Sequence, residues 1–206
     1  MIEVQEKDGR CLRLLTPAGV AEEPGLLIRM AIEQSRYEDA REVLAEAEQG
    51  DTGSAEWPML RAILELRLER NQQAADAFAR AERLGACARD CRLGRAGALL
   101  GLGAAEEAFE ILSSVMSENP ADAEVAQWLL RATVATERWS EAAEHLDRYL
   151  SLQPDDEAIR FAFASVNARL GRWQLARTQH LHLRSHSSIR GIEDLGRMIE
   201  DERCAA

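Results

Sequence analysis

The sequence predicts an all-α chain: a solenoid of five helix hairpins, preceded by a β-hairpin and closed by a capping helix. Three observations lead to this prediction. Alanine is abundant and β-branched residues are few, which favours helices. Alanine also recurs at a fixed interval of 34 residues, as expected of a repeat architecture. Finally, apolar residues near the carboxyl end recur at helical spacing.

The first twenty residues predict a β-hairpin. Ile2 and Val4 alternate with polar residues, as do Leu12 and Leu14. A three-residue loop that ends at Gly9 pairs Val4 with Leu12 and Ile2 with Leu14, whereas a two-residue loop breaks this apolar pairing. Because an isolated hairpin is marginally stable, we expect it to pack on the first repeat or on another chain.

The repeats that follow are defined by two columns of residues. One column holds Ala40, Ala74, Ala108, Ala142 and Ala176. Four positions after these alanines stand the larger residues Leu44, Phe78, Leu112, Leu146 and His180. A small residue of this kind allows the two helices of a hairpin to cross at short distance.

A 34-residue unit with this pattern resembles the tetratricopeptide (TPR) repeat. Clear examples are Ala142-x3-Leu146 and Gly171-x-Trp173-x2-Ala176. The resemblance covers residues 21–190 and implies a right-handed superhelix of antiparallel helix pairs. It is weakest in the third unit, where arginines stand at places that usually hold apolar residues. The predicted organisation is a hairpin and linker, five repeats and a cap with an acidic tail: 1–20, 21–54, 55–88, 89–122, 123–156, 157–190 and 191–206.

Helix ends agree with the period. Gly103 and Gly171 stand at internal turns, where a left-handed residue closes a helix. Residues placed to cap helix starts are Ser54, Asp122, Ser140 and either Asp155 or Asp156.

Composition and charge exclude several classes of protein. Apolar runs are too short to span a membrane, and the start lacks the features of a secretory signal. A net charge of −11 argues against a nucleic-acid binder. Four cysteines are too few for a disulfide scaffold, so we expect a cytoplasmic protein. One lysine against 24 arginines suggests a bacterial source of high genomic GC.

No motif for catalysis is found. The sequence lacks a glycine-rich phosphate loop, a G-x-S-x-G elbow and an H-E-x-x-H pair. Cys87 and Cys91 fit buried small residues better than a zinc site, because a second pair is missing. Of the three clustered histidines we expect His180 in the core and His182 and His186 in solvent. We therefore expect a non-catalytic protein with no metal and no cofactor.

The resemblance implies that a partner binds along the concave surface, which the first helix of each repeat lines. A carboxylate clamp is excluded because no lysine follows Lys7. The largely apolar groove suits an amphipathic helix or an extended apolar segment. Alternatively, half of these residues serve packing between repeats. The predicted groove residues are Met59, Ile63, Leu93, Gly94, Gly97, Leu100, Gly101, Gln127, Arg131, Val134, Phe161, Ser165 and Arg169.

Three of these residues are glycines on one helix face. Gly94, Gly97 and Gly101 are spaced i, i+3, i+7, and each glycine inside a helix costs about 0.5–1 kcal/mol relative to alanine. One hypothesis is a groove floor without side chains, which admits a partner. The other is tight packing against a neighbouring helix.

Charge divides the chain into two parts. Residues 1–157 carry a net charge of −14 and residues 158–206 a net charge of +3. A basic last repeat could receive an acidic partner or the acidic body of another copy. The predicted basic patch comprises Arg160, Arg169, Arg172, Arg177, Arg184 and Arg190.

These observations predict a protein-binding adaptor or chaperone that holds an apolar helix or extended segment of its partner. Two alternatives stay open. One is a regulatory or recruiting subunit of an enzyme complex, held through the amino-terminal hairpin. The other is a scaffold that self-assembles through its acidic body and basic last repeat.

Overall fold

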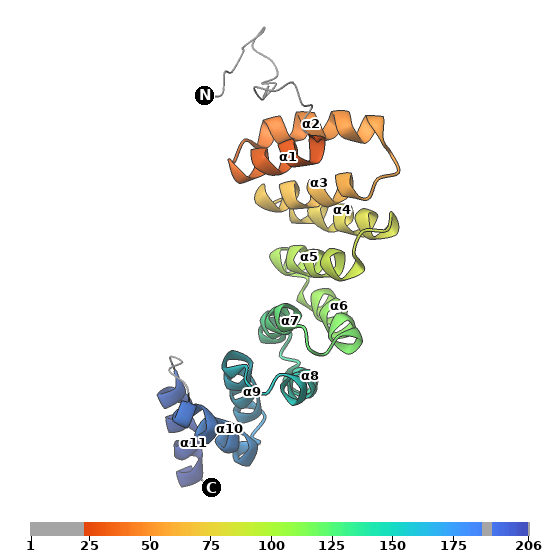
Figure 1. Cartoon of the computed structure of the whole chain (residues 1–206). Coiled ribbons are helices and arrows are strands. Elements are labelled where there is room, and N and C mark those ends of the chain that lie inside the picture. Colours follow the sequence, from red (N-terminus) through yellow and green to blue (C-terminus); the bar gives the residue numbers. More distant parts are fainter. Residues whose placement is uncertain (1–22, 187–190, 206) are drawn as a thin grey trace. The chain divides into compact units, whose positions relative to one another are not determined.

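The computed structural model describes residues 23–186 and 191–205. Over these residues the chain is all-α, with eleven helices and no strand (Figure 1). The predicted β-hairpin of residues 1–20 lies outside the described residues, as does Arg190.

The chain divides into two compact units, Met1–Leu102 (unit 1) and Gly103–Ala206 (unit 2). The helices of unit 1 are α1 (Pro24–Glu33), α2 (Tyr37–Gly50), α3 (Glu56–Arg67), α4 (Asn71–Arg83) and α5 (Ala88–Gly101). The helices of unit 2 are α6 (Ala105–Glu118), α7 (Ala123–Thr136), α8 (Trp139–Leu152), α9 (Glu157–Arg169), α10 (Trp173–His186) and α11 (Ile192–Ala205).

Within each unit, consecutive helices pack on each other as stacked hairpins (Figure 1). The first helices of neighbouring hairpins also meet: α1 packs on α3, α3 on α5, and α7 on α9. Each predicted 34-residue repeat corresponds to two helices, although α5 begins one residue before its window. The repeat boundaries themselves remain predictions.

The alanine column lies in the core of this stack. All five alanines are 0% exposed. Of the larger residues that follow them, Leu44, Leu112 and Leu146 are also completely buried, while Phe78 and His180 are 4% and 7% exposed. These two columns therefore belong to the buried interior of the helices.

A third column marks the turns inside the hairpins. Gly103 and Gly171 have φ of +77° and +69°, which confirms the prediction of left-handed turn residues. The same 34-residue spacing places Ser35, Glu69 and Glu137 at equivalent turns, with φ of +59°, +57° and +57°. Non-glycine residues rarely adopt this conformation, so these three turns are strained where the glycine turns are not.

Helix caps are found at two of the predicted positions. Asp122 accepts a hydrogen bond from the N–H of Val125 (3.1 Å), and Asp156 accepts one from the N–H of Ile159 (3.0 Å). Asp156, rather than its neighbour, is thus the cap of α9. The prediction for Ser140 is wrong, because α8 begins one residue earlier, at Trp139, so Ser140 lies inside its first turn.

Ser54 plays a related part at the start of α3. Its hydroxyl accepts a hydrogen bond from the N–H of Glu56 at 3.2 Å, although the residue at the cap position is Ala55. Ser54 therefore satisfies a free amide at the helix start from one position further out.

The last helix covers the last hairpin. Leu195 and Ile199 of α11 are 5% exposed and pack with Ala164, Ala168 and Ala176 of α9 and α10. This packing supports the predicted role of a capping helix. None of the described helices is both long enough and apolar enough to cross a membrane.

Candidate binding surfaces

Unit 1 contains a pocket of about 580 Å³ beside α1 and α3, the first helices of its first two hairpins. Its residues come from α1, from α3 and the residue just before it, and from the segment that precedes α5. They are Arg29, Ile32, Glu33, Ala55, Glu56, Met59, Leu60, Ile63, Arg67, Ala86 and Cys87. Two of them, Met59 and Ile63, belong to the predicted groove.

The sequence of α3 explains how these side chains reach the pocket. Leu60 and Leu64 are at most 1% exposed and join the core that α1 and α2 build. Met59 and Ile63 are four positions apart, so they share a helix face, and each is only partly buried. Helix α3 thus presents two adjacent apolar side chains at the pocket while its leucines anchor it to the core.

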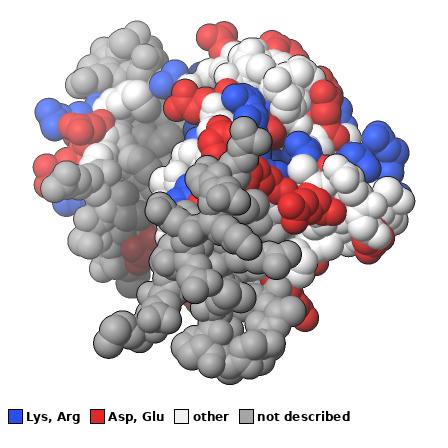
Figure 2. Space-filling view, turned by 90° about the horizontal axis from the view of Figure 1, so that it is seen from above, with Lys and Arg blue, Asp and Glu red and all other residues white. Residues whose placement is uncertain are grey.

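Charged groups of both signs surround this apolar floor. The guanidinium of Arg29 donates to Glu56 at 3.1 Å. Glu33 and Arg67 are exposed and form no ion pair with the described part of the chain. On the face seen in Figure 2, acidic and basic side chains are similarly intermixed. The pocket therefore suits an apolar side chain with polar flanks rather than a strongly charged ligand.

The glycine face of α5 packs on α4 at two of its three positions. A Cβ atom at Gly94 would lie 2.3 Å from the ring of Phe78, and one at Gly101 would lie 2.5 Å from the side chain of Asn71. Of the two hypotheses for these glycines, tight packing accounts for Gly94 and Gly101. Gly97 and Leu100 are half-buried, and Leu93 is 7% exposed.

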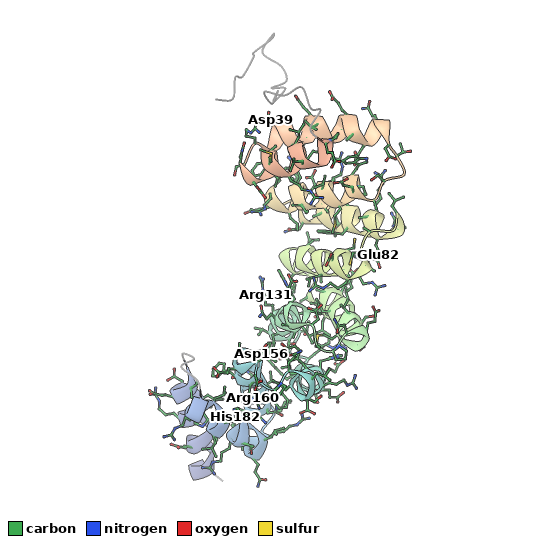
Figure 3. All side chains as sticks on the ribbon, in the orientation of Figure 1. Asp39, Glu82, Arg131, Asp156, Arg160 and His182 are labelled. Carbon is green, nitrogen blue, oxygen red and sulfur yellow. The ribbon has the colours of Figure 1, made fainter. Side chains whose placement is uncertain are left out.

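The predicted groove residues of α7 lie in solvent. Gln127 and Arg131 are exposed, and Val134 is 67% exposed. The guanidinium of Arg131 lies 4.3 Å from the ring centre of Trp128 (Figure 3), close enough for a cation–π interaction. Of the three predicted groove residues of α7, only Val134 is apolar.

The groove residues of α9 have partners of their own. Phe161 packs against the core cluster shared with α11. The hydroxyl of Ser165 donates to the carbonyl oxygen of Phe161. Arg169 stacks on Trp139 at 4.9 Å. Of these three, only Arg169 is exposed.

Two arginines of the predicted basic patch are held by neutral groups. Arg160 donates to the side-chain oxygen of Gln179 at 2.5 Å and to the carbonyl of Pro154 (Figure 3). Arg172 donates to the hydroxyl of Ser140 at 3.3 Å. These bonds fix the side chains without neutralising their charge.

Of the other three described arginines of the patch, Arg169 stacks on Trp139, and Arg177 and Arg184 lie on α10 and are exposed. On the same helix, His180 is 7% exposed and its Nε2 lies 3.0 Å from the carbonyl oxygen of Ile192, which confirms the prediction of a satisfied core histidine. The described residues contain no group of three His, Cys, Asp or Glu side chains that could hold a metal ion.

Cys87 and Cys91 differ from the prediction of a buried pair. Cys91 is buried, and burial is the main cause that raises the pKa of its thiol to about 11. Cys87 is exposed and lines the pocket, because it stands at the cap position, one residue before α5 begins. Position rather than residue type decides its exposure.

One pocket residue that sequence reasoning missed could have been found. Arg29 stands 34 residues before Ile63, so the repeat places it at the equivalent groove position of the first repeat. Ile32 and Cys87 have no such signal, because they enter the pocket through the way α1 and the turn before α5 pack beside α3.

Comparison with known proteins gives a family match over part of the chain and a shared fold. The tetratricopeptide repeat family (TPR_19) matches residues 99–178. A comparison with curated proteins returns no match.

Several solved structures share the fold at low sequence identity. MamA from Desulfovibrio magneticus is 19% identical, with a TM-score of 0.62 over 86% of this chain and 98% of that one. PilF of Pseudomonas aeruginosa is 16% identical, with a TM-score of 0.63 over 87% and 84%. YrrB, described as a TPR protein with an unusual peptide-binding site, is 15% identical, with a TM-score of 0.65 over 89% and 92%.

Proposed function

Since the chain is a tetratricopeptide repeat protein, we propose that it is a non-catalytic adaptor or chaperone that binds a segment of a partner protein. Proteins of this family are generally protein-binding scaffolds. The observation that carries the proposal is the pocket of unit 1, where Met59 and Ile63 lie beside each other at the surface between α1 and α3.

The chemistry of this pocket defines the segment that fits. Ile32, Met59 and Ile63 offer apolar contacts, and an aliphatic side chain that leaves water for such a site gains about 1.5–3 kcal/mol. Glu33 and Arg67 stand at the rim with no ion pair in the described part of the chain. A partner segment therefore places an apolar side chain in the pocket and polar or charged neighbours at its rim.

Two further observations support the proposal. YrrB, a protein of the same fold, has a peptide-binding site. The sequence lacks the phosphate-loop, nucleophile-elbow and zinc-protease motifs. With four cysteines in 206 residues, we place the protein in the cytoplasm, where thiols stay reduced.

The test selects peptides from a displayed random library on the immobilised protein and measures their affinities by fluorescence anisotropy. Met59→Glu puts a charge on the pocket floor, and we expect it to weaken selected apolar peptides about tenfold or more. Leu26→Glu is the matched control, because Leu26 is a leucine of α1 that is 50% exposed and lies outside the pocket.

Circular dichroism melting checks that both variants fold. Met59→Gln repeats the test without a charge, in case Met59→Glu unfolds the hairpin. Equal affinities for wild type and both Met59 variants would contradict the proposal.

A further inference from the structure

The outer face of α10 is formed by an arginine, a leucine and a second arginine. Arg177, Leu181 and Arg184 are spaced i, i+4, i+7, so they lie along one stripe of the helix. The core side of α10 lies elsewhere around the helix, where Ala176 and Leu183 are 0% exposed. Leu181 is 57% exposed, and both arginines are exposed. We call this stripe the basic face of α10.

The arginines of the basic face lack acidic neighbours. No aspartate or glutamate occurs from Ala158 to Arg190, and neither Arg177 nor Arg184 forms an ion pair with a described residue. Packing accounts for the buried side of α10, but no described acid compensates the charges of its basic face.

Helix α11 does not neutralise this face through its described side chains. Asp194 pairs with Arg197 of its own helix. Glu193 and Glu200 are exposed and form no ion pair with described residues. No acid among the described side chains therefore neutralises this charge, which a carboxylate from another molecule could do.

We propose that the basic face of α10 is a docking surface for an acidic amphipathic helix of a partner protein. Arg177 and Arg184 stand seven residues apart, which is about 10.5 Å along a helix. A partner helix with two carboxylates at the same spacing can meet both guanidinium groups, each of which donates planar, two-point hydrogen bonds to a carboxylate. An apolar side chain between those carboxylates covers Leu181.

The same features argue for a protein rather than a nucleic acid. Leu181 stands between the two arginines, where a phosphate backbone has nothing to gain from an apolar contact. The neighbouring residues 103–157 carry thirteen acids and three arginines, which repel a polyphosphate. In the same unit, Trp128 and Trp139 are already stacked by arginines, which competes with stacking on bases.

The basic face lies in unit 2 and is separate from the pocket of unit 1, so the two proposals can fail independently. The probe is a labelled synthetic peptide with two glutamates seven residues apart and a leucine midway, in a helix-forming alanine background. Its affinity is measured by anisotropy at low and at high salt. The double variant Arg177→Glu/Arg184→Glu is compared with Arg80→Glu/Arg83→Glu, which changes the net charge equally on α4, where both arginines are exposed.

We expect salt-sensitive binding to the wild type, a loss of tenfold or more in the α10 variant, and a change of less than twofold in the α4 variant. Leu181→Ser should weaken binding several-fold at every salt concentration. Met59→Glu should leave this binding unchanged. A peptide with lysines in place of the glutamates should bind the α10 reversal variant better than the wild type.

Three results would overturn the proposal. Equal losses in the α10 and α4 variants would show a general charge effect. Tighter binding of oligothymidylate than of the acidic peptide would assign the face to nucleic acid. Self-association in sedimentation that the α10 reversal abolishes would assign it to a second copy of this chain.

Discussion

Units 1 and 2 share one framework and expose different chemistry. In both, the alanine column is fully buried and helix hairpins stack in chain order. Unit 1 opens an apolar pocket between α1 and α3 with charges of both signs at its rim. Unit 2 leaves α10 with arginines that no described acid neutralises. The buried positions of the repeat thus hold similar residues in both units, whereas the exposed residues differ in polarity and charge.

Two arginines of unit 2, Arg138 and Arg177, differ in their acidic partners. Arg138 donates to Glu141 and Glu110 and stacks on the ring of Phe109 at 4.2 Å. The hydrogen bond to Glu141, followed by that to Glu110, raises the pKa of Arg138 above its usual range. Arg177 has no comparable acidic partner among the described residues. Acidic partners therefore hold Arg138, whereas the proposed docking surface uses the charge of Arg177, which no described acid pairs with.

The largest expected effect comes from the leucines that follow the alanine column. Leu44 in unit 1 and Leu146 in unit 2 occupy equivalent positions and are 0% exposed. We expect Leu44→Ala and Leu146→Ala each to cost about 2–5 kcal/mol, through lost burial and a cavity. Because repeats contact mainly their neighbours, amide hydrogen exchange should rise in the unit that carries the substitution. Equal acceleration across both units would show that they unfold as one.

The next effect concerns the helix starts, where the two units differ. Asp156 caps α9 and also accepts a hydrogen bond from the phenol of Tyr149 at 2.7 Å. Asp156→Ala should cost about 1–2 kcal/mol, because it removes both bonds. Tyr149→Phe removes only the second and should cost less. Urea titrations of both variants and of the double variant measure the coupling between the two bonds.

In unit 1, the start of α5 lacks such a cap. Cys87 occupies the cap position and makes no side-chain hydrogen bond there. Cys87→Asp should therefore stabilise unit 1 by about 0.5–1 kcal/mol, and Cys87→Ala serves as its control. If Cys87→Asp melts no higher than Cys87→Ala, the missing side-chain cap of α5 does not limit the stability of unit 1.

Much of the fold could be predicted from the sequence, because the same type of residue recurs at each buried position in five repeats. The same column logic identified Met59 and Ile63 as groove residues, and both line the pocket. It could not distinguish exposed from packed positions on α5, because a glycine carries no signal of which neighbour approaches it. The ring of Phe78, which fills the space beside Gly94, is seen only once helices α4 and α5 are placed.

The helix caps show another limit. Ser140 has the right residue type and spacing for a cap, yet α8 begins at Trp139. A cap depends on the backbone angles of a single residue, and a shift of one position at the helix start is enough to remove it. Residue type therefore predicts that a cap lies near a given place, but not which residue forms it.

An effect of similar size is expected at the turns. Glu69 in unit 1 and Gly171 in unit 2 occupy equivalent positions with φ of +57° and +69°. A left-handed conformation costs a non-glycine residue about 1 kcal/mol. Gly171→Ala should therefore lose about 1 kcal/mol, whereas Glu69→Gly should gain less than that, because glycine also adds entropy to the unfolded chain. Thermal melting of the two variants measures both changes, and a loss in Glu69→Gly would contradict the assignment of strain.

The smallest effect is a pH dependence confined to unit 2, which contains all four histidines. Burial, with the nearby Arg148 as a second cause, lowers the pKa of His145, while Glu144 and Glu141 oppose the shift. Its Nε2 lies 2.7 Å from the hydroxyl of Ser113 on α6.

Because the folded state favours the neutral imidazole, this contribution to stability is complete above the usual histidine pKa of about 6.5. It is lost as the pH falls below that value. Hydrogen exchange should therefore accelerate in α6 and α8 between about pH 7 and pH 5.5, after correction for intrinsic rates, and less so in unit 1. His145→Gln keeps a polar side chain that does not titrate, so it should remove this part of the pH dependence. An unchanged profile in that variant would assign the acid sensitivity of unit 2 to groups other than His145.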